Sequence, residues 1–476
     1  MTASRTPATP GESLGQQSVK PRLVARARRP VTVSVQGVDT STGDPVTRPA
    51  RAPRALLVAA FDSQLKWAAH LGSELRERGF ECRYVAPRER VALSKDQVRA
   101  AGADQVDLVW KDEILDLALD VDVVVLALAG PQVRHFTLDL TERMAAEPRQ
   151  EPAPVVVAGW VGVIIEKITA GYLDRSGADV VAVNARHELD HFREVARRLE
   201  IDPGNLLLSG LPILSTSPRP QPSAPVRTVL FADQPTVPDT AADRLYVYRR
   251  LAAYARRHPD RRVLLKPRHR QGEDTFHRMH HHPEELLSGD ALPSNFTVDY
   301  RPVPQLLGET DLLVTMSSTA CLEAVDHGVR VALVLDLGVH ERYGNHVFLD
   351  SGLLRTFDQL EVDDIGTPSA AWVDSWFGGR SVTPAQAVVD RVEKLLATGE
   401  RPSLAAMTSP YQQGALELHR ARLSGEVPEP PGPWARRRRR HGLVKGTALQ
   451  LGIWLVPPAA LKPLKKWRNQ RRIKKL

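Results

Sequence analysis

Residues 55–86 decide the fold, and they read ALLVAAFDSQLKWAAHLGSELRERGFECRYVA. The run from Ala55 to Phe61 is continuously apolar, which is typical of a parallel strand buried on both faces. The segment from Gln64 to Arg78 is amphipathic, and Gly79 follows it where a helix C-cap is expected. Another strand is expected over 81–86. The order strand, helix, strand predicts an α/β protein with a doubly wound sheet.

The same alternation extends over most of the chain and is interrupted once. Residues 215–225 contain four prolines in eleven positions without periodicity, which predicts an extended linker. Further strands are expected over 121–128, 155–160, 179–183, 206–209, 228–232, 262–266, 296–300, 312–316 and 331–335. Helices are expected over 242–257, 319–326 and 382–397. We therefore predict two Rossmann-like domains, 55–214 and 226–425, that face each other across a cleft.

The positive charge of the chain is concentrated at its two ends. The net charge is +8 over 476 residues, whereas residues 55–433 alone carry −12. An acidic body argues against specific binding of nucleic acid, for which a basic face is expected. Cys82 and Cys321 lie on different predicted elements, so the sequence excludes a disulfide framework and a cysteine-based zinc site. Residues 1–54 predict a disordered leader without the apolar stretch of a signal peptide.

A row of hydroxyl residues stands at the end of a predicted strand. Ser317, Ser318 and Thr319 follow the strand 312–316 and open a predicted helix that contains Glu323. Hydroxyls and free backbone amides at a helix N-terminus are suited to bind anions. An N-cap without a ligand explains one such hydroxyl but not three in a row. The pattern favours a phosphate-type ligand.

A basic segment follows another predicted strand. Lys266 ends the apolar run, and Arg268 and His269 come directly after it. Arginine binds phosphate or carboxylate through two parallel hydrogen bonds, and lysine contributes a point charge. A solvated basic loop is the alternative. The position at a strand end, one unit before the hydroxyl row, favours an anion site.

These two segments resemble the donor site of bacterial GT-B sialyltransferases and polysialyltransferases. Those families carry a His-Pro motif and a Ser-Ser motif, which hold the phosphate and the sugar of a CMP-activated acidic sugar. The resemblance implies that Lys266 and His269 stand for the first motif and residues 317–319 for the second. Gln234, within Phe-Ala-Asp-Gln-Pro, resembles their strand-end Gln-Pro loop. In this chain Arg-His-Arg replaces His-Pro. Residues 55–425 also resemble an actinobacterial family of proposed glycosyltransferases.

Candidates for the acceptor side lie in the N-terminal half. Gly159, Trp160 and Gly162 end a predicted strand, where glycine permits close approach of the backbone to a ligand. A GT-B transferase that inverts needs a carboxylate or a histidine to take the proton of the acceptor hydroxyl. Glu166 and Asp62 are the catalytic candidates. A helix N-cap or a salt-bridged side chain is the alternative for each.

Two polar loops are less specific. The loop after the strand 331–335 contains Asn345, which is expected either to contact the nucleotide or sugar or to lie on a plain surface loop. A second loop suggests a zinc site through His277, His280, His281, His282 and Asp274. Adjacent histidines cannot all face one ion on a regular element, so we expect no metal there. The resemblance to GT-B enzymes also implies that no metal is required and that the nucleotide sugar is a substrate, with no cofactor.

The C-terminal segment 426–476 begins with a proline-rich hinge and is basic. Residues 434–476 hold 14 Lys and Arg and no Asp or Glu, and they flank an apolar stretch, 446–461, that contains Trp454. As a helix, this stretch would reach only about 24 Å, less than the roughly 30 Å of a bilayer core. We predict that it lies on an anionic membrane surface, at the cytoplasmic face of the plasma membrane. A disordered tail that binds RNA without specificity is the alternative.

The sequence thus predicts a peripheral membrane glycosyltransferase. It would move a sugar, such as a sialic-acid-like one, from a nucleotide-activated donor to a cell-envelope glycan or lipid-linked acceptor. A nucleotide-sugar epimerase of the same fold is one alternative, and it would need no membrane tail. A catalytically inactive GT-B scaffold recruited to the membrane is another, and it would lack affinity for nucleotides.

Overall fold

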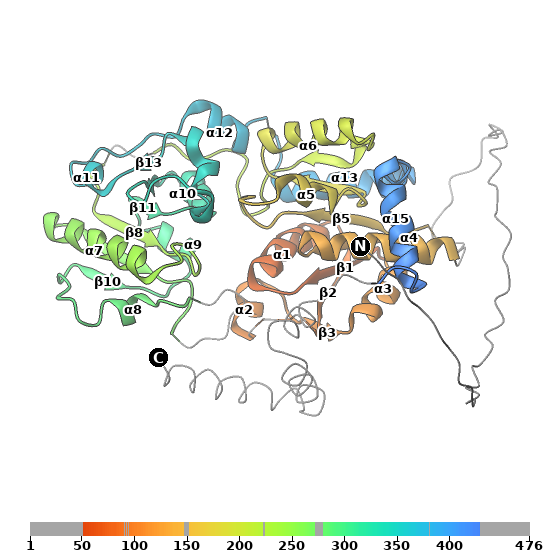
Figure 1. Cartoon of the computed structure of the whole chain (residues 1–476), viewed down its shortest axis with the longest axis horizontal. Coiled ribbons are helices and arrows are strands. Elements are labelled where there is room, and N and C mark those ends of the chain that lie inside the picture. The colour runs from red at the N-terminus through yellow and green to blue at the C-terminus, as the bar shows by residue number, and fades with distance from the viewer. Residues whose placement is uncertain are drawn as a thin grey trace, which may run out of the picture. The chain divides into compact units, whose positions relative to one another are not determined.

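The computed structural model describes residues 51–428, except 90, 92, 94, 147–151, 222–223, 272–278 and 380 (Figure 1). The predicted leader, apart from its last four residues, and the predicted membrane tail lie outside the described residues. Among the described residues, no helix is both long enough and apolar enough to cross a membrane.

The described N-terminal strands form one parallel sheet in the order β3-β2-β1-β4-β5-β6-β7. Leu57 in the central strand lies beside Tyr84 on one side and Val125 on the other. The strands are β1 (Arg54–Ala59), β2 (Glu81–Pro87), β3 (Asp107–Val109), β4 (Val123–Ala127), β5 (Val155–Gly159), β6 (Val180–Val183) and β7 (Leu206–Leu208). Strands β4, β5 and β6 are buried along their whole length, as expected for a sheet covered on both faces.

Helices cover both faces of this sheet (Figure 1). Alternate residues of β1 point to opposite sides: Leu56 packs in one core cluster with Phe136 of α4, and Leu57 packs in a second cluster with Leu71 of α1. The helices are α1 (Asp62–Glu77), α2 (Lys95–Ala100), α3 (Lys111–Leu119), α4 (Gly130–Ala146), α5 (Ile168–Leu173), α6 (Arg186–Arg198) and the short 3₁₀ helix η1 (Pro203–Asn205). The doubly wound sheet predicted from the sequence is confirmed.

The described C-terminal strands form a second parallel sheet in the order β10-β9-β8-β11-β12-β13. The strands are β8 (Thr228–Ala232), β9 (Arg262–Lys266), β10 (Phe296–Val298), β11 (Leu312–Thr315), β12 (Arg330–Val334) and β13 (Leu354–Arg355). The helices are α7 (Ala241–Arg257), α8 (Pro283–Leu286), α9 (Val303–Leu307), α10 (Ala320–Asp326), η2 (Glu341–Tyr343), η3 (Asn345–Ser351), α11 (Phe357–Leu360) and α12 (Ala370–Phe377). This second sheet also has separate core clusters on its two faces.

The last described helices return to the N-terminal sheet. They are α13 (Pro384–Thr398), α14 (Pro402–Met407) and α15 (Pro410–Leu423). Val388 and Val392 of α13 pack in the same core cluster as Leu71 of α1. The Ser403 hydroxyl donates to the buried carboxylate of Asp179 at 2.5 Å. The structure therefore differs from the sequence-based boundary, which assigned residues up to 425 to the C-terminal domain, because the apolar face of α13 is buried against the first sheet.

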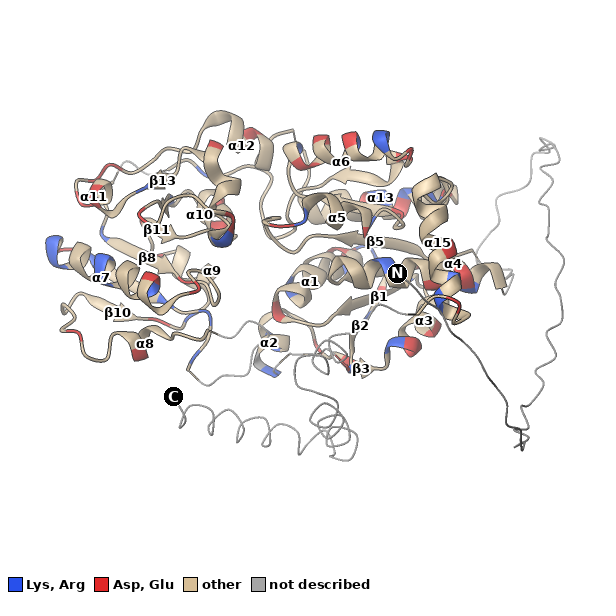
Figure 2. Cartoon of the chain, in the orientation of Figure 1, with Lys and Arg blue, Asp and Glu red and all other residues tan. Residues whose placement is uncertain are grey.

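Acidic and basic side chains are mixed along the described helices. Figure 2 shows both signs on α6, α7 and α15. Many of these charges are paired on the surface, for example Arg249 with Asp290 at 2.9 Å and Arg420 with Glu142 at 2.8 Å. The absence of a nucleic-acid partner stays a prediction.

Candidate functional site

The order of the C-terminal sheet reverses between β8 and β11, and the segments after these strands meet there. Ligands of open α/β sheets bind at such switch points, outside the carboxyl ends of the strands. Gln234 follows β8, and Ser317 follows β11. The side-chain oxygen of Gln234 accepts a hydrogen bond from the Ser317 backbone amide at 2.9 Å. The structure thus brings two of the predicted donor-site residues together.

Ser317 is fully engaged within the protein. It is 1% exposed, and its hydroxyl donates to the Tyr343 carbonyl at 2.6 Å. The same oxygen accepts from the side-chain nitrogen of Gln234 at 3.3 Å. Because a serine hydroxyl has one proton, Ser317 has none left to donate to a ligand.

The next two hydroxyls have different surroundings. The Ser318 oxygen accepts from the backbone amide of Ala320 at 3.2 Å, and the side chain is half-buried. Among the described residues its proton has no acceptor, so it is available to a ligand. The Thr319 hydroxyl oxygen accepts from the Val163 amide, in the loop after β5, at 3.3 Å. The Thr319 proton likewise has no acceptor among the described residues, so Ser318 and Thr319 each offer a free donor, and Ser318 is the one nearer to the end of β11.

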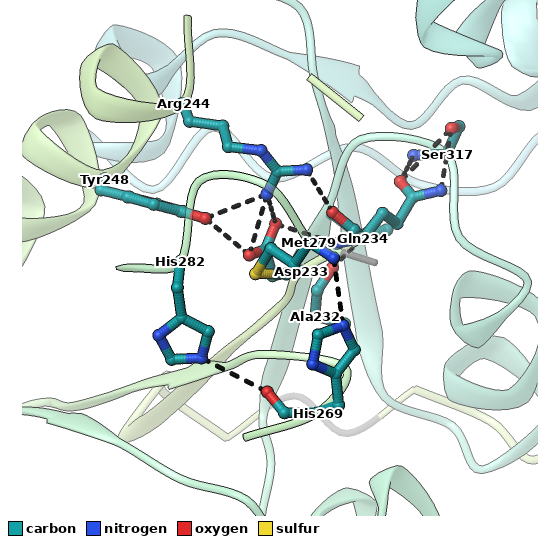
Figure 3. A network of polar contacts seen from close by, with 10 residues as sticks. Ala232, Asp233, Gln234, Arg244, Tyr248, His269, Met279, His282 and Ser317 are labelled. Atoms are coloured by element: carbon teal, nitrogen blue, oxygen red, sulfur yellow. Dashed lines mark hydrogen bonds and ion pairs between the residues drawn. The ribbon is translucent and has the colours of Figure 1, made fainter. Parts of the chain in front are cut away.

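A buried polar network lies beneath Gln234 (Figure 3). Arg244 and Asp233 form an ion pair at 3.1 Å, and both side chains are 1% exposed. Arg244 also donates to the Gln234 carbonyl at 2.5 Å, and Tyr248 donates to Asp233 at 2.6 Å. The sequence analysis missed Arg244 and Tyr248. In sequence they look like ordinary positions of the amphipathic helix α7, and the one available signal was the unpaired Asp233 at a strand end.

Lys266 ends β9, the strand that pairs with β8 on the other side. Its side chain is 8% exposed, and its ammonium donates to the Pro267 carbonyl at 3.0 Å. The pKa of Lys266 is lowered to about 8, mainly by burial and in addition by the positive charges of Arg268 and Lys66, whereas the carboxylates of Asp299 and Asp233 act against that shift. Among the described residues no carboxylate forms an ion pair with it. A buried ammonium without a counter-ion is suited to receive an anionic ligand.

Charged side chains from α1, the loop after β9 and α10 gather near Lys266. We call Asp62, Lys66, Lys266, Arg268 and Glu323 the charged cluster. Asp62 pairs with Arg268 at 3.0 Å and with Lys66 at 3.2 Å. Burial raises the pKa of Glu323, and the charges of Lys66 and Arg268 act against that shift. Arg268 and Lys66 therefore each interact with Asp62, Lys266 and Glu323, and Lys66 was not predicted from the sequence.

His269 is engaged in its own loop. Its Nε2 accepts from the Met279 amide at 3.1 Å, so its Nδ1 carries the proton and donates to the Arg270 carbonyl at 3.0 Å (Figure 3). His282 contacts the His269 carbonyl at 3.3 Å. Both ring nitrogens of His269 therefore form hydrogen bonds within its own loop. One of these bonds would have to break before His269 could contact a phosphate. Its predicted place on the donor phosphate stays a prediction.

The family of this chain follows from a sequence comparison. A family model described as "Putative glycosyltransferase (DUF6716)" matches residues 55–395, which is more than half of the chain and spans both sheets. The chain belongs to the DUF6716 family. No curated protein matches the DUF6716 chain. The predicted GT-B fold class is confirmed, whereas the resemblance to sialyltransferases is not tested by this match.

Solved structures show distant similarity to the DUF6716 chain. A structure described as a "putative UDP-N-acetylglucosamine 2-epimerase" from Listeria monocytogenes is 12% identical to this chain in sequence, with a TM-score of 0.43. The match covers 80% of this chain and 98% of that one. MurG of Acinetobacter baumannii is 13% identical with a TM-score of 0.38, covering 77% and 99%. UGT89C1 of Arabidopsis thaliana, complexed with UDP-L-rhamnose, is 10% identical with a TM-score of 0.43, covering 78% and 100%. Similarity at this level is too distant to transfer a substrate or a residue role.

The loop after β5 in the DUF6716 chain holds the remaining N-terminal candidates. Gly159 lies against Trp67 of α1, where an added Cβ would come within 2.8 Å of the indole, so packing accounts for this glycine. An added Cβ at Gly162 would come within 2.8 Å of the Thr319 hydroxyl. Glu166 is exposed, and among the described residues it has no hydrogen-bond partner. Of the two catalytic candidates, only Asp62 lies in the charged cluster.

Two more predicted residues of the DUF6716 chain serve the protein's own structure. Trp160 stacks on Phe192 with ring centroids 5.0 Å apart, and the Arg175 guanidinium lies 4.4 Å from the centroid of the Trp160 ring. Asn345 is fully buried; its side chain donates to the Gly338 carbonyl at 2.9 Å and accepts from the His340 amide at 3.0 Å. Both residues are therefore consumed in packing or loop closure and offer no free group to a ligand.

The histidine-rich loop is described only in part. His277 and Asp274 lie outside the described residues. His282 is buried and accepts from the Glu284 amide at 3.3 Å, which caps α8. Among the described residues, no group of three or more metal-ligating side chains lies together. Metal independence stays a prediction.

Proposed function

We propose that the DUF6716 chain transfers a sugar from a nucleotide-activated donor to a cell-envelope glycan or lipid-linked acceptor. The observation that carries this proposal is the buried, unpaired ammonium of Lys266 beside the switch point of the C-terminal sheet. The carboxylates of Asp233 and Asp299 act on this charge without forming an ion pair with it, and a phosphate of the donor would supply a direct counter-ion. The free hydroxyl of Ser318 lies after a neighbouring strand and supports the same location.

The composition of the charged cluster supports an acidic sugar as the donor. Lys66, Lys266 and Arg268 bring three positive charges to one region, against the carboxylates of Asp62 and Glu323. A CMP-linked acidic sugar carries a phosphate and a carboxylate. Arg268 binds either group through two parallel hydrogen bonds once it leaves Asp62, and Lys266 provides a point charge.

Asp62 is the base that best fits the reaction. It would take the proton of the acceptor hydroxyl, whose oxygen then forms a bond to the anomeric carbon. The bond from that carbon to the phosphate oxygen breaks, and the electron pair leaves with the nucleotide phosphate. Lys266 and Ser318 would stabilise the charge that develops there. Asp62 would first exchange Arg268 for the acceptor hydroxyl, and no metal enters this scheme.

We further propose that residues 434–476, which lie outside the described residues, bring the enzyme to the anionic inner surface of the plasma membrane. Their 14 basic residues and the tryptophans Trp454 and Trp467 support this. A lipid-linked acceptor would be presented at the same surface.

Calorimetry with CMP, CDP, UDP and GDP, followed by the corresponding nucleotide sugars, tests the proposal. Binding of one nucleotide that weakens at least tenfold in Lys266→Ala is expected, since a hydrogen bond to a charged group contributes about 1.5–3 kcal/mol. An epimerase would instead convert the free nucleotide sugar without any acceptor. An inactive scaffold would bind none of these nucleotides. Either result would contradict the proposed transfer.

A further inference from the structure

Hydrogen bonds connect the switch point to α7 in a closed ring. Arg244 of α7 donates to the Gln234 carbonyl, and the Gln234 side chain bonds to Ser317. The Ser317 hydroxyl donates to the Tyr343 carbonyl. The Tyr343 hydroxyl then donates to Asp243, the neighbour of Arg244 on α7, at 3.2 Å. We call these five residues the strand-end ring.

The strand-end ring joins segments that are far apart in sequence. Gln234 follows β8, Ser317 follows β11, and Tyr343 ends the 3₁₀ helix η2 beyond β12. Ser317, Tyr343 and Arg244 are each 1% exposed. Figure 3 shows the half of the ring that runs from Arg244 through Gln234 to Ser317. Buried polar groups of this kind hold their neighbours in one arrangement when every member is satisfied.

Ser317 has no free group of its own to give a ligand. It donates its one proton to Tyr343, and the Gln234 side chain bonds to it through both its oxygen and its nitrogen. The first free donor after β11 is the adjacent Ser318 hydroxyl. The segment after β11 is therefore held in place at Ser317, and the Ser318 hydroxyl is available to a ligand.

We propose that Arg244 and Tyr343 are positioning residues that act through Gln234 and Ser317 to hold Ser318 in place for the donor phosphate. The proposal rests on the proposed function, because it assigns the phosphate of the donor to Ser318. Ordering a loop residue costs backbone entropy. The ring orders this loop when the protein folds, so no further backbone entropy is lost there when the nucleotide binds.

Tyr343→Phe is the sharpest test, because it removes the bond to Asp243, together with the bond that the hydroxyl accepts from Arg342, and keeps the buried aromatic ring. Tyr246→Phe is the control: Tyr246 lies on α7, donates to an aspartate, Asp336, at 3.1 Å, and lies outside the ring, but it is more exposed than Tyr343. We expect Tyr343→Phe to weaken nucleotide binding about fivefold in calorimetry, whereas Tyr246→Phe leaves it unchanged. A fivefold change corresponds to about 1 kcal/mol.

Hydrogen exchange provides a readout that does not need a ligand. In Tyr343→Phe, the backbone amides of 316–320 should exchange faster than in the wild type and in Tyr246→Phe. Unchanged exchange there would overturn the proposal, whether or not nucleotide binds. Faster exchange with unchanged nucleotide affinity would also overturn it, because the ring would then be structural only. If the wild type binds no nucleotide, the proposed function fails, and with it the link from the ring to the donor.

Substitutions of Ser317 and Ser318 distinguish a residue that positions the loop from a residue that contacts the phosphate. Ser318→Ala removes the group that touches phosphate, so it should lower affinity and leave the exchange of the 316 and 317 amides unchanged, whereas the Ala320 amide loses its acceptor and exchanges faster. Ser317→Ala breaks the ring, so it should change both. Arg244→Lys keeps the charge beside Asp233 but cannot also reach the Gln234 carbonyl, and it should behave like Ser317→Ala. Equal behaviour of Ser317→Ala and Ser318→Ala in both measurements would contradict this division of roles.

Discussion

Arg268 and Asp62 form an ion pair at 3.0 Å, which joins the loop after β9 to the first turn of α1. The Arg268 side chain is 51% exposed, and exposed pairs contribute only about 0–1 kcal/mol. Asp62 keeps a second partner, Lys66, at 3.2 Å. Arg268 can therefore leave Asp62 for a phosphate or carboxylate of a ligand at small cost.

Asp62→Asn should separate binding from catalysis. The amide cannot hold Arg268 by charge, so Arg268 becomes free and nucleotide affinity is expected to stay the same or rise by about two- to fivefold. Transfer should fall by at least about a hundredfold, because a general base typically contributes 10²–10⁴ in rate. Calorimetry and a transfer assay on the same protein measure the two effects. Glu166→Gln serves as the matched control, and a larger loss of transfer in Glu166→Gln would move the base to Glu166.

The affinity for nucleotide should depend on the charge of Lys266. Its pKa is lowered to about 8 by burial, first of all, and by Arg268 and Lys66. Phosphate binds the charged form, so affinity should be constant below pH 8 and fall above it, by up to about tenfold per pH unit. Calorimetry between pH 7 and 9.5 measures this profile.

Lys266→Arg provides the comparison for that profile. Arginine keeps its charge throughout this range, so the decline of affinity above pH 8 should disappear even if the overall affinity changes. An equal decline in both proteins would show that another group causes it.

The pattern of strands and helices was largely predictable because each strand is a short apolar run between polar segments. The expected strand 262–266 and the expected helix 242–257 agree with β9 and α7 to within a residue. The edge strands β3 and β13 were not predicted. They have only three and two residues, and Asp107 opens β3, so they lack the apolar run on which the prediction depends.

The grouping of the candidate residues was predictable only where they stand at a strand end. Lys266, Gln234 and Ser317 were singled out because parallel strands deliver their ends to one edge of the sheet, and their role as a site stays a prediction. Arg244 and Tyr343 were not found, since a helix residue and a loop residue give no sign in sequence that they bond to those strand ends. His269 was found at a strand end, but the sequence could not show that its two ring nitrogens are used within its own loop.

The stability of the protein should fall with increasing pH through a carboxyl group outside the site. Glu188 is 1% exposed at the start of α6, and burial raises its pKa to about 8, against the two backbone amides that it accepts. The folded protein keeps this proton up to about pH 8, whereas the unfolded chain loses it near pH 4.5. The free energy of unfolding therefore decreases as pH rises between these values.

Glu188→Gln tests this dependence. Glutamine can still accept from the Asn184 and Ala185 amides, as Glu188 does at 3.2 Å, but it has no proton to lose. The Tm of the variant relative to the wild type should rise between pH 6 and pH 9, by about 2–4 °C for each kcal/mol of difference. Melting curves at both pH values measure it. A constant difference in Tm would mean that Glu188 stays in one protonation state over this range.

Removal of 434–476 should abolish binding to anionic vesicles and leave the described fold intact. Each Lys or Arg near an anionic surface contributes about 1 kcal/mol, so half of the 14 basic residues are enough to hold the protein there. Co-sedimentation with vesicles that contain about one third phosphatidylserine measures binding, and an unchanged Tm of the truncated protein checks the fold.

Two full-length variants then distinguish the contributions of charge and of the tryptophans. Replacing Arg436–Arg440 by glutamine removes charge, and replacing Trp454 and Trp467 by serine removes the interfacial anchors. If the tail lies on the membrane, both variants should weaken binding, and the tryptophan variant should keep its salt dependence. Loss of binding in the arginine variant alone would instead indicate a purely electrostatic tail, and equal sedimentation of the truncated protein would contradict the prediction.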